Sequence, residues 1–380
     1  MFKKRVLGII VLVAVIGFSM IACDNGGGGG GNTGGNGGGG SDNPGGGNNN
    51  VNVYVSGAYW DSNDNDIACY WANGVRTDLP VPNGTDGFAT GITVQGGKVY
   101  VSGMYFDSNY NGTACYWVNG TRIDLVPGGT EGVSIRAYDI NVQGGKVYVS
   151  GNFGSHWVDN NDKAFYWVDG VIKDLPVPDG TAGFTYGIAV IDGKVYVSGH
   201  YSYYDYDSEY YNSTACYWVN GTRTDLTVPN GTEGGALGIT VQGGNVYVAG
   251  CYLDKDYNKA CYWVNGARTD LAVPTGKEGE AYGITVQGND VYVSGHYYDS
   301  DYYAYACYWV NGQRTDLSGD SDNDFPPKIT VNDGKVYVSG FYIDSNDNYK
   351  ACYWVDGTRV NLPIPSRTES VATGIVVVTQ

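Results

Sequence analysis

A cysteine and a tryptophan recur at a fixed spacing along this sequence, and both residue types can take part in chemistry. The phrase ACYW or AFYW ends at Trp71, Trp117, Trp167, Trp218, Trp263, Trp309 and Trp354. Cysteine thiolates bind zinc and copper, so one thiol from each copy could contribute to a metal site. An indole is a flat amphipathic platform, so the tryptophans could instead form a ring on which sugars stack.

Tyrosine, aspartate and asparagine gather in the segments that follow a second repeated phrase, VYVSG. This mixture combines rigid contact area with hydrogen-bonding groups, as binding loops do. The ligand-binding candidates are Tyr203, Tyr204, Asp205, Tyr206, Asp207, Glu209, Tyr210, Tyr211, Tyr297, Tyr298, Asp299, Asp301, Tyr302, Tyr303, His156 and Trp157. The alternative is that these tyrosines pair across extended hairpins and stabilise them.

Two of these segments have the alternating acid and amide spacing of a calcium loop. The candidate ligands are Asp61, Asn63, Asn65, Asp344, Asn346 and Asn348. An EF-hand has Gly at the sixth position and Glu at the twelfth, where the first segment has Asp66 and Ala72. The spacing therefore predicts at most weak, extracellular-type calcium binding, and we expect no other cofactor.

Carboxylates also recur ahead of the GITV-type phrase, where clustered acids could do acid chemistry. They are Asp86, Glu131, Glu233, Glu278 and Glu369. Neighbouring carboxylates raise one another's pKa, but solvated loop acids are commoner than catalytic ones. The histidines His156, His200 and His296 fall in three different copies, so they assemble no triad or zinc site. We predict a protein without enzymatic activity, with a polysaccharide hydrolase or lyase as the alternative.

The elements that must position these residues are short strands repeated seven times. A VYVSG-like phrase begins at Val53, Val99, Val147, Val195, Val246, Val291 and Val336. Each copy contains four strand-like phrases of the types GITV, KVYVSG, ACYWV and TRIDL, with an Asn-Gly or Asp-Gly turn before the last. Four antiparallel strands in units of about 40 to 50 residues predict an all-β fold, a seven-bladed β-propeller over residues 51–380.

The two ends of this repeat region complement each other. The first copy begins at VYVSG and lacks its GITV strand, whereas the strand GIVVV, residues 374–378, follows the last copy. We predict that the C-terminal strand joins the first blade, which would close the ring and leave no open sheet edge.

Ring geometry decides between chemistry and scaffold for the repeated phrase. The third strand of a blade would lie about 17 Å from the axis, so equivalent cysteines would be about 15 Å apart. That distance excludes a shared metal or a disulfide between blades. We therefore predict that these cysteines and tryptophans pack blade against blade, and that Arg-x-Asp pairs such as Arg122 and Asp124 are outer-strand ion pairs.

Cys251 lies outside the repeated phrase, ten residues before Cys261. A hairpin with its loop at 254–258 would set the two thiols opposite each other, and an exported protein can form disulfides. A shift of one residue in register would instead place them on opposite faces. The sequence therefore leaves a Cys251–Cys261 disulfide open.

One segment carries a family resemblance. AFYWVDGVIKDL, residues 164–175, resembles the HAF-type repeats of exported bacterial proteins through Ala164, Phe165, Trp167, Gly170, Asp174 and Leu175. The other copies match apart from Cys in place of Phe, and Asn361 replaces the Asp in the last one. After the Asp-Leu pair this chain has V-P-x-G-T-E-G instead of a Gly-Thr-Leu-Gly-Gly run. The resemblance spans residues 51–380 and implies an exported repeat protein without assigning a reaction.

The N-terminus has the order of an export signal. Lys3, Lys4 and Arg5 precede an apolar run of 17 residues, 6–22, and Cys23 follows. This resembles a bacterial lipoprotein signal peptide over residues 1–22, after which the thiol of Cys23 is acylated. An uncleaved membrane helix is the alternative, but it usually needs about 18 or more apolar residues.

Residues 23–50 would form a tether between this lipid and the propeller. Their Gly and Asn-rich composition cannot bury apolar surface, and their mean reach is about 30 Å. The formal net charge of −17 repels phosphate backbones, so we expect no nucleic-acid partner. We predict a monomer, lipid-anchored at the outer membrane or cell surface of a bacterium, which binds a protein or glycan and contacts the membrane only through its lipid.

Overall fold

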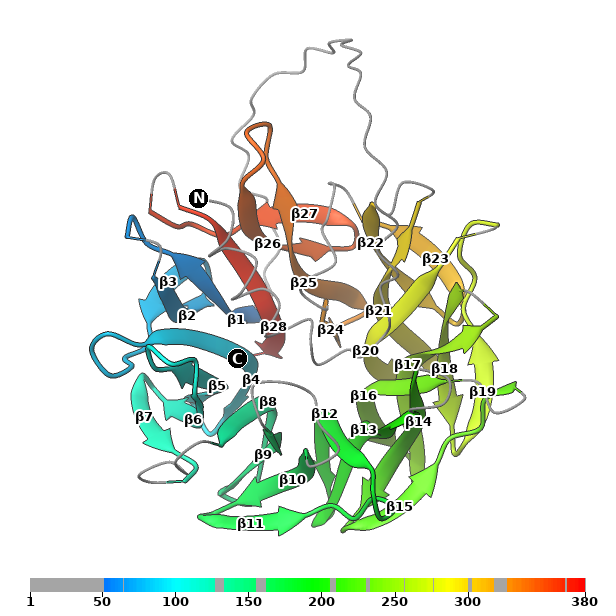
Figure 1. Ribbon diagram of the computed structural model, residues 1–380. Helices are drawn as coiled ribbons and strands as arrows, with labels where there is room; N and C mark the ends of the chain where they lie inside the picture. Colours follow the sequence, from blue (N-terminus) through cyan, green and yellow to red (C-terminus); the bar gives the residue numbers. More distant parts are fainter. Residues whose placement is uncertain are drawn as a thin grey trace, which may run out of the picture.

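The computed structural model describes residues 51–379 except 64, 127–132, 155–161, 206–209, 230–232, 256, 276, 300–302, 318–326 and 366–367, and gives only the backbone at 205, 210 and 211. The chain is a seven-bladed β-propeller of four-stranded antiparallel sheets (Figure 1). This confirms the predicted fold class. No helix long and apolar enough to span a membrane occurs within the described ranges.

Each blade uses its strands in order from the axis outward, and blade 1 takes its first strand from the C-terminus. The innermost strands of blades 1 to 7 are β28 (Ser370–Thr379), β4 (Asp86–Gln95), β8 (Ser134–Gln143), β12 (Ala182–Ile191), β16 (Gly234–Gln242), β20 (Gly279–Gln287) and β24 (Ile329–Asn332). The second strands are β1 (Val51–Trp60), β5 (Lys98–Phe106), β9 (Lys146–Gly154), β13 (Lys194–Asp205), β17 (Asn245–Asp254), β21 (Asp290–Tyr298) and β25 (Lys335–Ile343). The third strands are β2 (Asp66–Ala72), β6 (Gly112–Val118), β10 (Lys163–Val168), β14 (Tyr210–Val219), β18 (Tyr257–Val264), β22 (Ala304–Val310) and β26 (Tyr349–Val355). The outermost strands are β3 (Val75–Asp78), β7 (Thr121–Asp124), β11 (Val171–Asp174), β15 (Thr222–Asp225), β19 (Ala267–Asp270), β23 (Gln313–Asp316) and β27 (Thr358–Asn361).

The ring closes where the two ends of the described chain meet. Strand β28 pairs antiparallel with β1, and Val377 lies opposite Val53 while Ile375 lies opposite Val55. The first blade thereby gains the innermost strand that its own copy of the repeat lacks, as predicted. No blade is left with an unpaired inner position.

Tight turns define one side of the ring, which we call the turn side. In blade 2, Asn119 and Gly120 have φ values of 48° and 83°, the left-handed dihedrals of a two-residue hairpin turn. The Asn119 side chain also accepts a hydrogen bond from the Val99 amide at 2.9 Å, which ties the turn to the neighbouring strand. The connections between second and third strands, and those between blades, lie on the opposite side, which we call the loop side.

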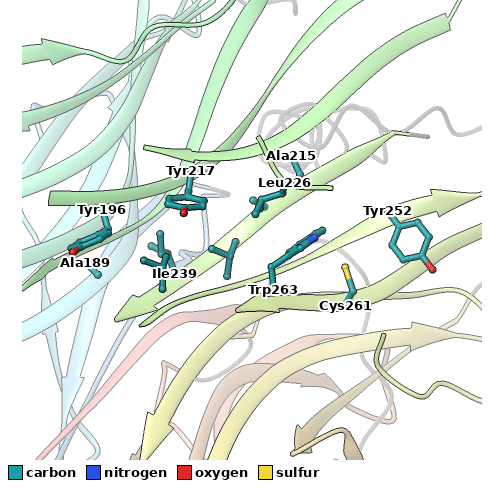
Figure 2. Close-up of a cluster of buried hydrophobic side chains, with 12 residues drawn as sticks. Ala189, Tyr196, Ala215, Tyr217, Leu226, Ile239, Tyr252, Cys261 and Trp263 are labelled. Carbon is teal, nitrogen blue, oxygen red and sulfur yellow. The ribbon is translucent and has the colours of Figure 1, made fainter. Parts of the chain in front are cut away.

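The repeated tryptophans pack one blade against the next, as predicted. In blade 5, Trp263 is fully buried and its Nε1 donates to the Thr227 carbonyl of blade 4 at 3.0 Å. Figure 2 shows Trp263 beside Leu226, with Tyr217 of blade 4 in the same apolar cluster. The indole therefore belongs to the scaffold and offers no surface on which a sugar could stack.

The repeated cysteines are also scaffold residues. Cys261 in blade 5 is free and fully buried in the same cluster. Phe165 occupies the equivalent place in blade 3 and is likewise fully buried, so an apolar group suffices there.

The disulfide between Cys251 and Cys261 is not formed, and that interpretation is wrong. Both thiols are free, and Ala260, not Cys261, lies opposite Cys251. The hairpin continues to the pair Asp254 and Tyr257, which shortens the expected loop and shifts the register by one residue. Because side chains alternate along a strand, the two thiols face opposite sides of the sheet.

The Arg-x-Asp pairs are outer-strand ion pairs, as predicted. In blade 5 the Nε atom of Arg268 lies 2.7 Å from the Asp270 carboxylate. The same guanidinium lies over the ring of Tyr252, 4.2 Å from its centroid, and the Tyr252 hydroxyl donates to Asp270 at 3.2 Å. These contacts stabilise the rim of the blade.

Candidate functional site

The predicted binding residues of blade 4 lie along one extended hairpin. Strands β13 and β14 continue past the length usual for the other blades, and Tyr204 lies opposite Tyr211. Tyr203 is 44% exposed, whereas Tyr204 is half-buried. The segment therefore pairs across the hairpin and also presents a phenol to solvent. Tyr206, Asp207 and Glu209 lie outside the described residues, as do His156, Trp157, Asp301 and Tyr302 elsewhere.

The predicted residues of blade 6 have different roles. Tyr297 stacks on Tyr305 with ring centroids 5.4 Å apart, a structural contact between strands. Asp299 accepts the Tyr303 amide at 3.0 Å and the Tyr305 hydroxyl at 3.2 Å, which holds the loop in shape. Tyr303 is 64% exposed. Tyr298 instead turns inward and bonds to His296.

The calcium candidates serve to close their own loops. The Asp61 carboxylate accepts the amides of Asn63 and Asn65 at 2.8 and 3.0 Å. Asp344 binds Asn346 and Asn348 in the same way. Within the described residues no group of three or more His, Cys, Asp or Glu side chains is arranged to hold a metal ion. The spacing that resembles a calcium loop thus produces a hydrogen-bonded turn.

Four of the predicted acids of the loop side, Asp86, Glu233, Glu278 and Glu369, belong to four different blades. Burial raises the pKa of Glu233 to about 6 and also raises the pKa of Glu278. Glu131 lies outside the described residues. The Asp86 carboxylate accepts the Asp66 amide at 3.2 Å. Burial, together with the charges of Asp86 and Asp61, raises the pKa of Asp66 to about 8.

A buried layer that sequence reasoning missed lies just beneath the loop side. On the second strands, the position opposite the invariant Ala of the ACYW phrase holds six residue types in seven blades. They are Ala58, Met104, Asn152, His200, Cys251, His296 and Phe341. Their partners on the innermost strands, for blades 1 to 6, are Val371, Phe88, Arg136, Phe184, Gly235 and Glu280. We call these two sets the variable layer.

The variable layer is apolar on one half of the ring. Phe341 of blade 7, Val371 of blade 1, and Phe88 and Met104 of blade 2 form one buried cluster. Phe106 joins it from the end of the same strand as Met104. This half of the variable layer is therefore a packed apolar core.

Blade 6 supplies the most connected polar group on the other half. Glu280 is 4% exposed and accepts a hydrogen bond from the Asn258 amide at 2.7 Å and another from the Tyr282 hydroxyl. Nε2 of His296 lies 3.4 Å from the Tyr282 hydroxyl and 2.7 Å from that of Tyr298. Through Tyr298 this buried chain of groups reaches the loop side.

The electrostatics of this group follow from its burial. Burial raises the pKa of Glu280, although hydrogen bonds from Tyr282 and Asn258 act in the opposite direction. Burial also lowers the pKa of His296 to about 3, so the imidazole is neutral near pH 7. The Glu280 carboxylate lies 3.6 Å from His296, and this contact is a polar one without a charged imidazolium.

Blade 4 adds a second histidine and a tyrosine. Nδ1 of His200 lies 3.3 Å from the Tyr186 hydroxyl, and the imidazole stacks on Phe184 with centroids 4.8 Å apart. Burial lowers the pKa of His200 to about 4. Tyr186 packs in one apolar contact group with Cys251 of blade 5 and Tyr282 of blade 6, which joins the three blades.

Blade 3 completes the polar half with a buried cation. Arg136 is 5% exposed, and its Nε has no hydrogen-bond partner among the described residues; the same is true of both amide atoms of Asn152 beside it. Tyr138, two residues along β8, lies with its ring 5.9 Å from that of Tyr186. We call blades 3 to 6 the polar half of the layer, beneath the loops that carry the predicted tyrosines. Its polar side chains come from blades 3, 4 and 6, and Cys251 and Gly235 of blade 5 lie between them.

Comparisons with known proteins give the architecture alone. No protein-family model matches the chain, and no curated protein does. Among solved structures, the chain is similar to the β-propeller domain of the Trilobed protease from Pyrococcus furiosus, with 12% identity and a TM-score of 0.49 over 83% of this chain and 93% of that one. It is also similar to the BP39L lectin from Burkholderia pseudomallei, with 12% identity and a TM-score of 0.45 over 83% and 98%. AztD from Citrobacter koseri has 13% identity and a TM-score of 0.40 over 87% and 98%.

Proposed function

We propose that the protein is a lipid-anchored binding protein of the bacterial cell envelope, and that the loop side of blades 4 to 6 holds its ligand. The export signal, Cys23 and the tether support the location, and the resemblance to HAF-type repeats agrees with it. We favour a glycan as the ligand, and a protein surface is the other class.

The observation that carries this proposal is where aromatic side chains are exposed. Tyr203, Tyr257 and Tyr303 are 44%, 46% and 64% exposed, and they belong to the loop side of blades 4, 5 and 6. The other large apolar side chains exposed to this degree in the described part of the chain are aliphatic, such as Val75 and Val171 beside tight turns. Exposed tyrosines therefore cluster on three consecutive blades, above the polar half of the variable layer.

Tyrosines at this place suit a sugar for a physical reason. A phenol ring offers an apolar face to the C–H groups of a pyranose, and its hydroxyl bonds to the sugar hydroxyls. Neighbouring loop acids and amides, such as Asp254 beside Tyr257, provide further hydrogen-bonding groups. The strongly acidic composition disfavours polyanionic glycans, so a neutral or basic glycan fits best.

Binding to a glycan panel tests the proposal. The ring closes within residues 51–380, so this fragment can be used without its lipid. We expect the triple variant Tyr203→Ala, Tyr257→Ala and Tyr303→Ala to bind the best glycan at least about 10-fold more weakly, since each stacked ring contributes about 1 kcal/mol. The control is Val75→Ala with Val171→Ala, which removes exposed apolar groups from the turn side and should leave affinity unchanged. Equal affinity of the triple variant and the wild type would contradict the proposal.

The alternative function, a polysaccharide hydrolase or lyase, has one observation in its favour. Asp66 and Asp86 are close enough to interact, and the raised pKa of Asp66 would suit a general acid. Turnover of a glycan by the wild type that is lost in Asp66→Asn, Glu233→Gln or Glu278→Gln would establish this alternative.

A further inference from the structure

A cavity of about 140 Å³ lies on the propeller axis, inside the innermost strands. Its walls are formed by one dipeptide from each of several blades. The consensus sequence of this dipeptide in the repeat is Gly-Ile. The seven dipeptides, which we call the Gly-Ile ring, are Gly374-Ile375, Gly91-Ile92, Asp139-Ile140, Gly187-Ile188, Gly238-Ile239, Gly283-Ile284 and Lys328-Ile329. Blade 3 thus has Asp139 and blade 7 has Lys328 where the others have glycine.

Asp139 shows what the backbone of this ring can bind. Its carboxylate accepts the Ile140 amide at 2.9 Å and the Ile188 amide of the next blade at 3.3 Å. An innermost strand is paired on one edge only, so the N–H and C=O groups of its other edge point to the axis. The isoleucine amides of the ring therefore form a set of donors, and two of them already hold a carboxylate.

The glycines of the ring have no side chain that could bond to the isoleucine amide of the next blade, as Asp139 does. A Cβ added at Gly187 would lie 3.1 Å from the Ile239 amide nitrogen. At Gly283 the corresponding distance to the Ile329 nitrogen is 3.0 Å. A side chain at these glycines would therefore lie directly against the amide of the next blade, as that of Asp139 does in blade 3, and Ile239, Gly283 and Ile329 line the cavity.

Lys328 adds a positive charge to the same wall. Its side chain is half-buried and lines the cavity. Its backbone amide donates to Ser339 Oγ at 3.2 Å, as Gly187 does to Ser198 at 3.1 Å, so the main chain keeps the ring geometry. Only blades 1 and 2 separate blade 7 from blade 3 on the shorter arc of the ring, and Lys328 and Asp139 line the same cavity. Burial raises the pKa of Asp139, and the positive charge of Lys328 acts in the opposite direction.

We propose that the cavity is a binding site for a small oxyanion, a carboxylate or a phosphate, held by the Lys328 ammonium and by isoleucine amides of the Gly-Ile ring. Asp139, the carboxylate of the lining, is bonded to two of these amides, which shows that an oxyanion fits against the ring. Backbone N–H groups that converge on one point bind anions in other settings for the same reason. The site is separate from the loop side and does not depend on the proposed glycan binding.

Thermal unfolding of the fragment 51–380 tests this site with sodium phosphate and, separately, sodium acetate, each against sodium chloride of equal ionic strength. A ligand that binds the folded state raises the melting temperature by mass action. We expect a rise of at least about 2 °C with one of the two anions. The anion that gives the larger rise at equal concentration identifies the class.

Variants that restore the repeat consensus locate the effect. Lys328→Gly should abolish the rise, whereas Asp139→Gly should enlarge it by removing a negative charge and freeing two amides. Lys335→Gln, at an exposed turn of the same blade, is the matched control and should respond like the wild type. Since phosphate stabilises most proteins in general, the difference between wild type and Lys328→Gly is the decisive quantity. No rise in the wild type, or an equal rise in Lys328→Gly, would overturn the proposal.

Discussion

In the variable layer, equivalent backbone positions carry side chains of very different chemistry in different blades. His200, Cys251 and His296 occupy the same place in three consecutive blades, directly after the last Gly of the VYVSG-like phrase. The histidines are neutral near pH 7 because burial lowers the pKa of His200 to about 4 and that of His296 to about 3. They therefore act as hydrogen-bond partners of tyrosines and not as charges.

The lowered pKa of His200 makes stability depend on pH in a defined direction. In the unfolded chain His200 is protonated below about pH 6.5, whereas in the folded protein it is protonated only below about pH 4. The free energy of unfolding therefore falls as the pH is lowered through this window. Phenylalanine occupies the equivalent position in blade 7, as Phe341. We therefore expect the free energy of unfolding of His200→Phe to fall by about 2 kcal/mol less than that of the wild type when the pH is lowered from 7 to 4.5.

Urea unfolding at these two pH values measures the effect. Other titrating groups, Asp66 and Glu280 among them, are common to both proteins, so the difference in slope reports His200 alone. An equal loss of stability in the variant and the wild type would contradict a neutral, buried His200.

At the scale of the strand and the blade, the third strand holds the ring together and the outermost strand contributes little. Trp263 is fully buried and bonds to the carbonyl of Thr227 in the preceding blade. Arg268 in the same blade forms an ion pair with Asp270, whose side chain is 54% exposed. Water screens such a pair, whereas it cannot reach the indole.

We expect Trp263→Phe to lower the free energy of unfolding by about 2 kcal/mol or more, because it removes a buried hydrogen bond and leaves a void. Arg268→Gln, the control in the same blade, should cost less than about 1 kcal/mol. Equilibrium unfolding in urea compares the two. A larger loss in the arginine variant would show that the rim, and not the packing between blades, dominates stability.

The strands of this fold could be predicted from the sequence because the signals repeat. Asn-Gly and Asp-Gly turns occur in every copy, and the orphan strand at 374–378 matched the one that the first copy lacks. The register of a single hairpin could not be predicted in the same way. The loop after Cys251 was expected to span 254–258, but Asp254 and Tyr257 still pair, and the cysteines end up on opposite faces.

The variable layer was missed although its signal was present. Positions where the copies differ were sought only in the loops, since strand residues within a repeat usually serve the shared architecture. Yet the residue after the last Gly of VYVSG varies more than its neighbours, from Ala58 to His296 and Phe341. That such a position is buried and joined across blades depends on packing between strands far apart in sequence, which a single sequence does not reveal.

The whole molecule is a regular scaffold around which polar side chains and exposed tyrosines are unevenly distributed. Blades 7, 1 and 2 fill the variable layer with an apolar cluster, whereas blades 3, 4 and 6 contribute polar side chains to it and blade 5 contributes Cys251 and Gly235. The exposed tyrosines lie above blades 4 to 6, and the Gly-Ile ring surrounds the axis below. The seven blades thus share one backbone architecture, and blades 3 to 6 differ from the rest in the side chains that they carry.

Hydrogen exchange with and without the best glycan of the panel is the most direct test of ligand binding on the loop side of blades 4 to 6. The account predicts slower amide exchange in the hairpin around Tyr203, at the start of β18 and in the segment before β22, with the Asn-Gly turns of the same blades unchanged. Protection confined to the turn side, or to the loops of blades 7, 1 and 2, would contradict it.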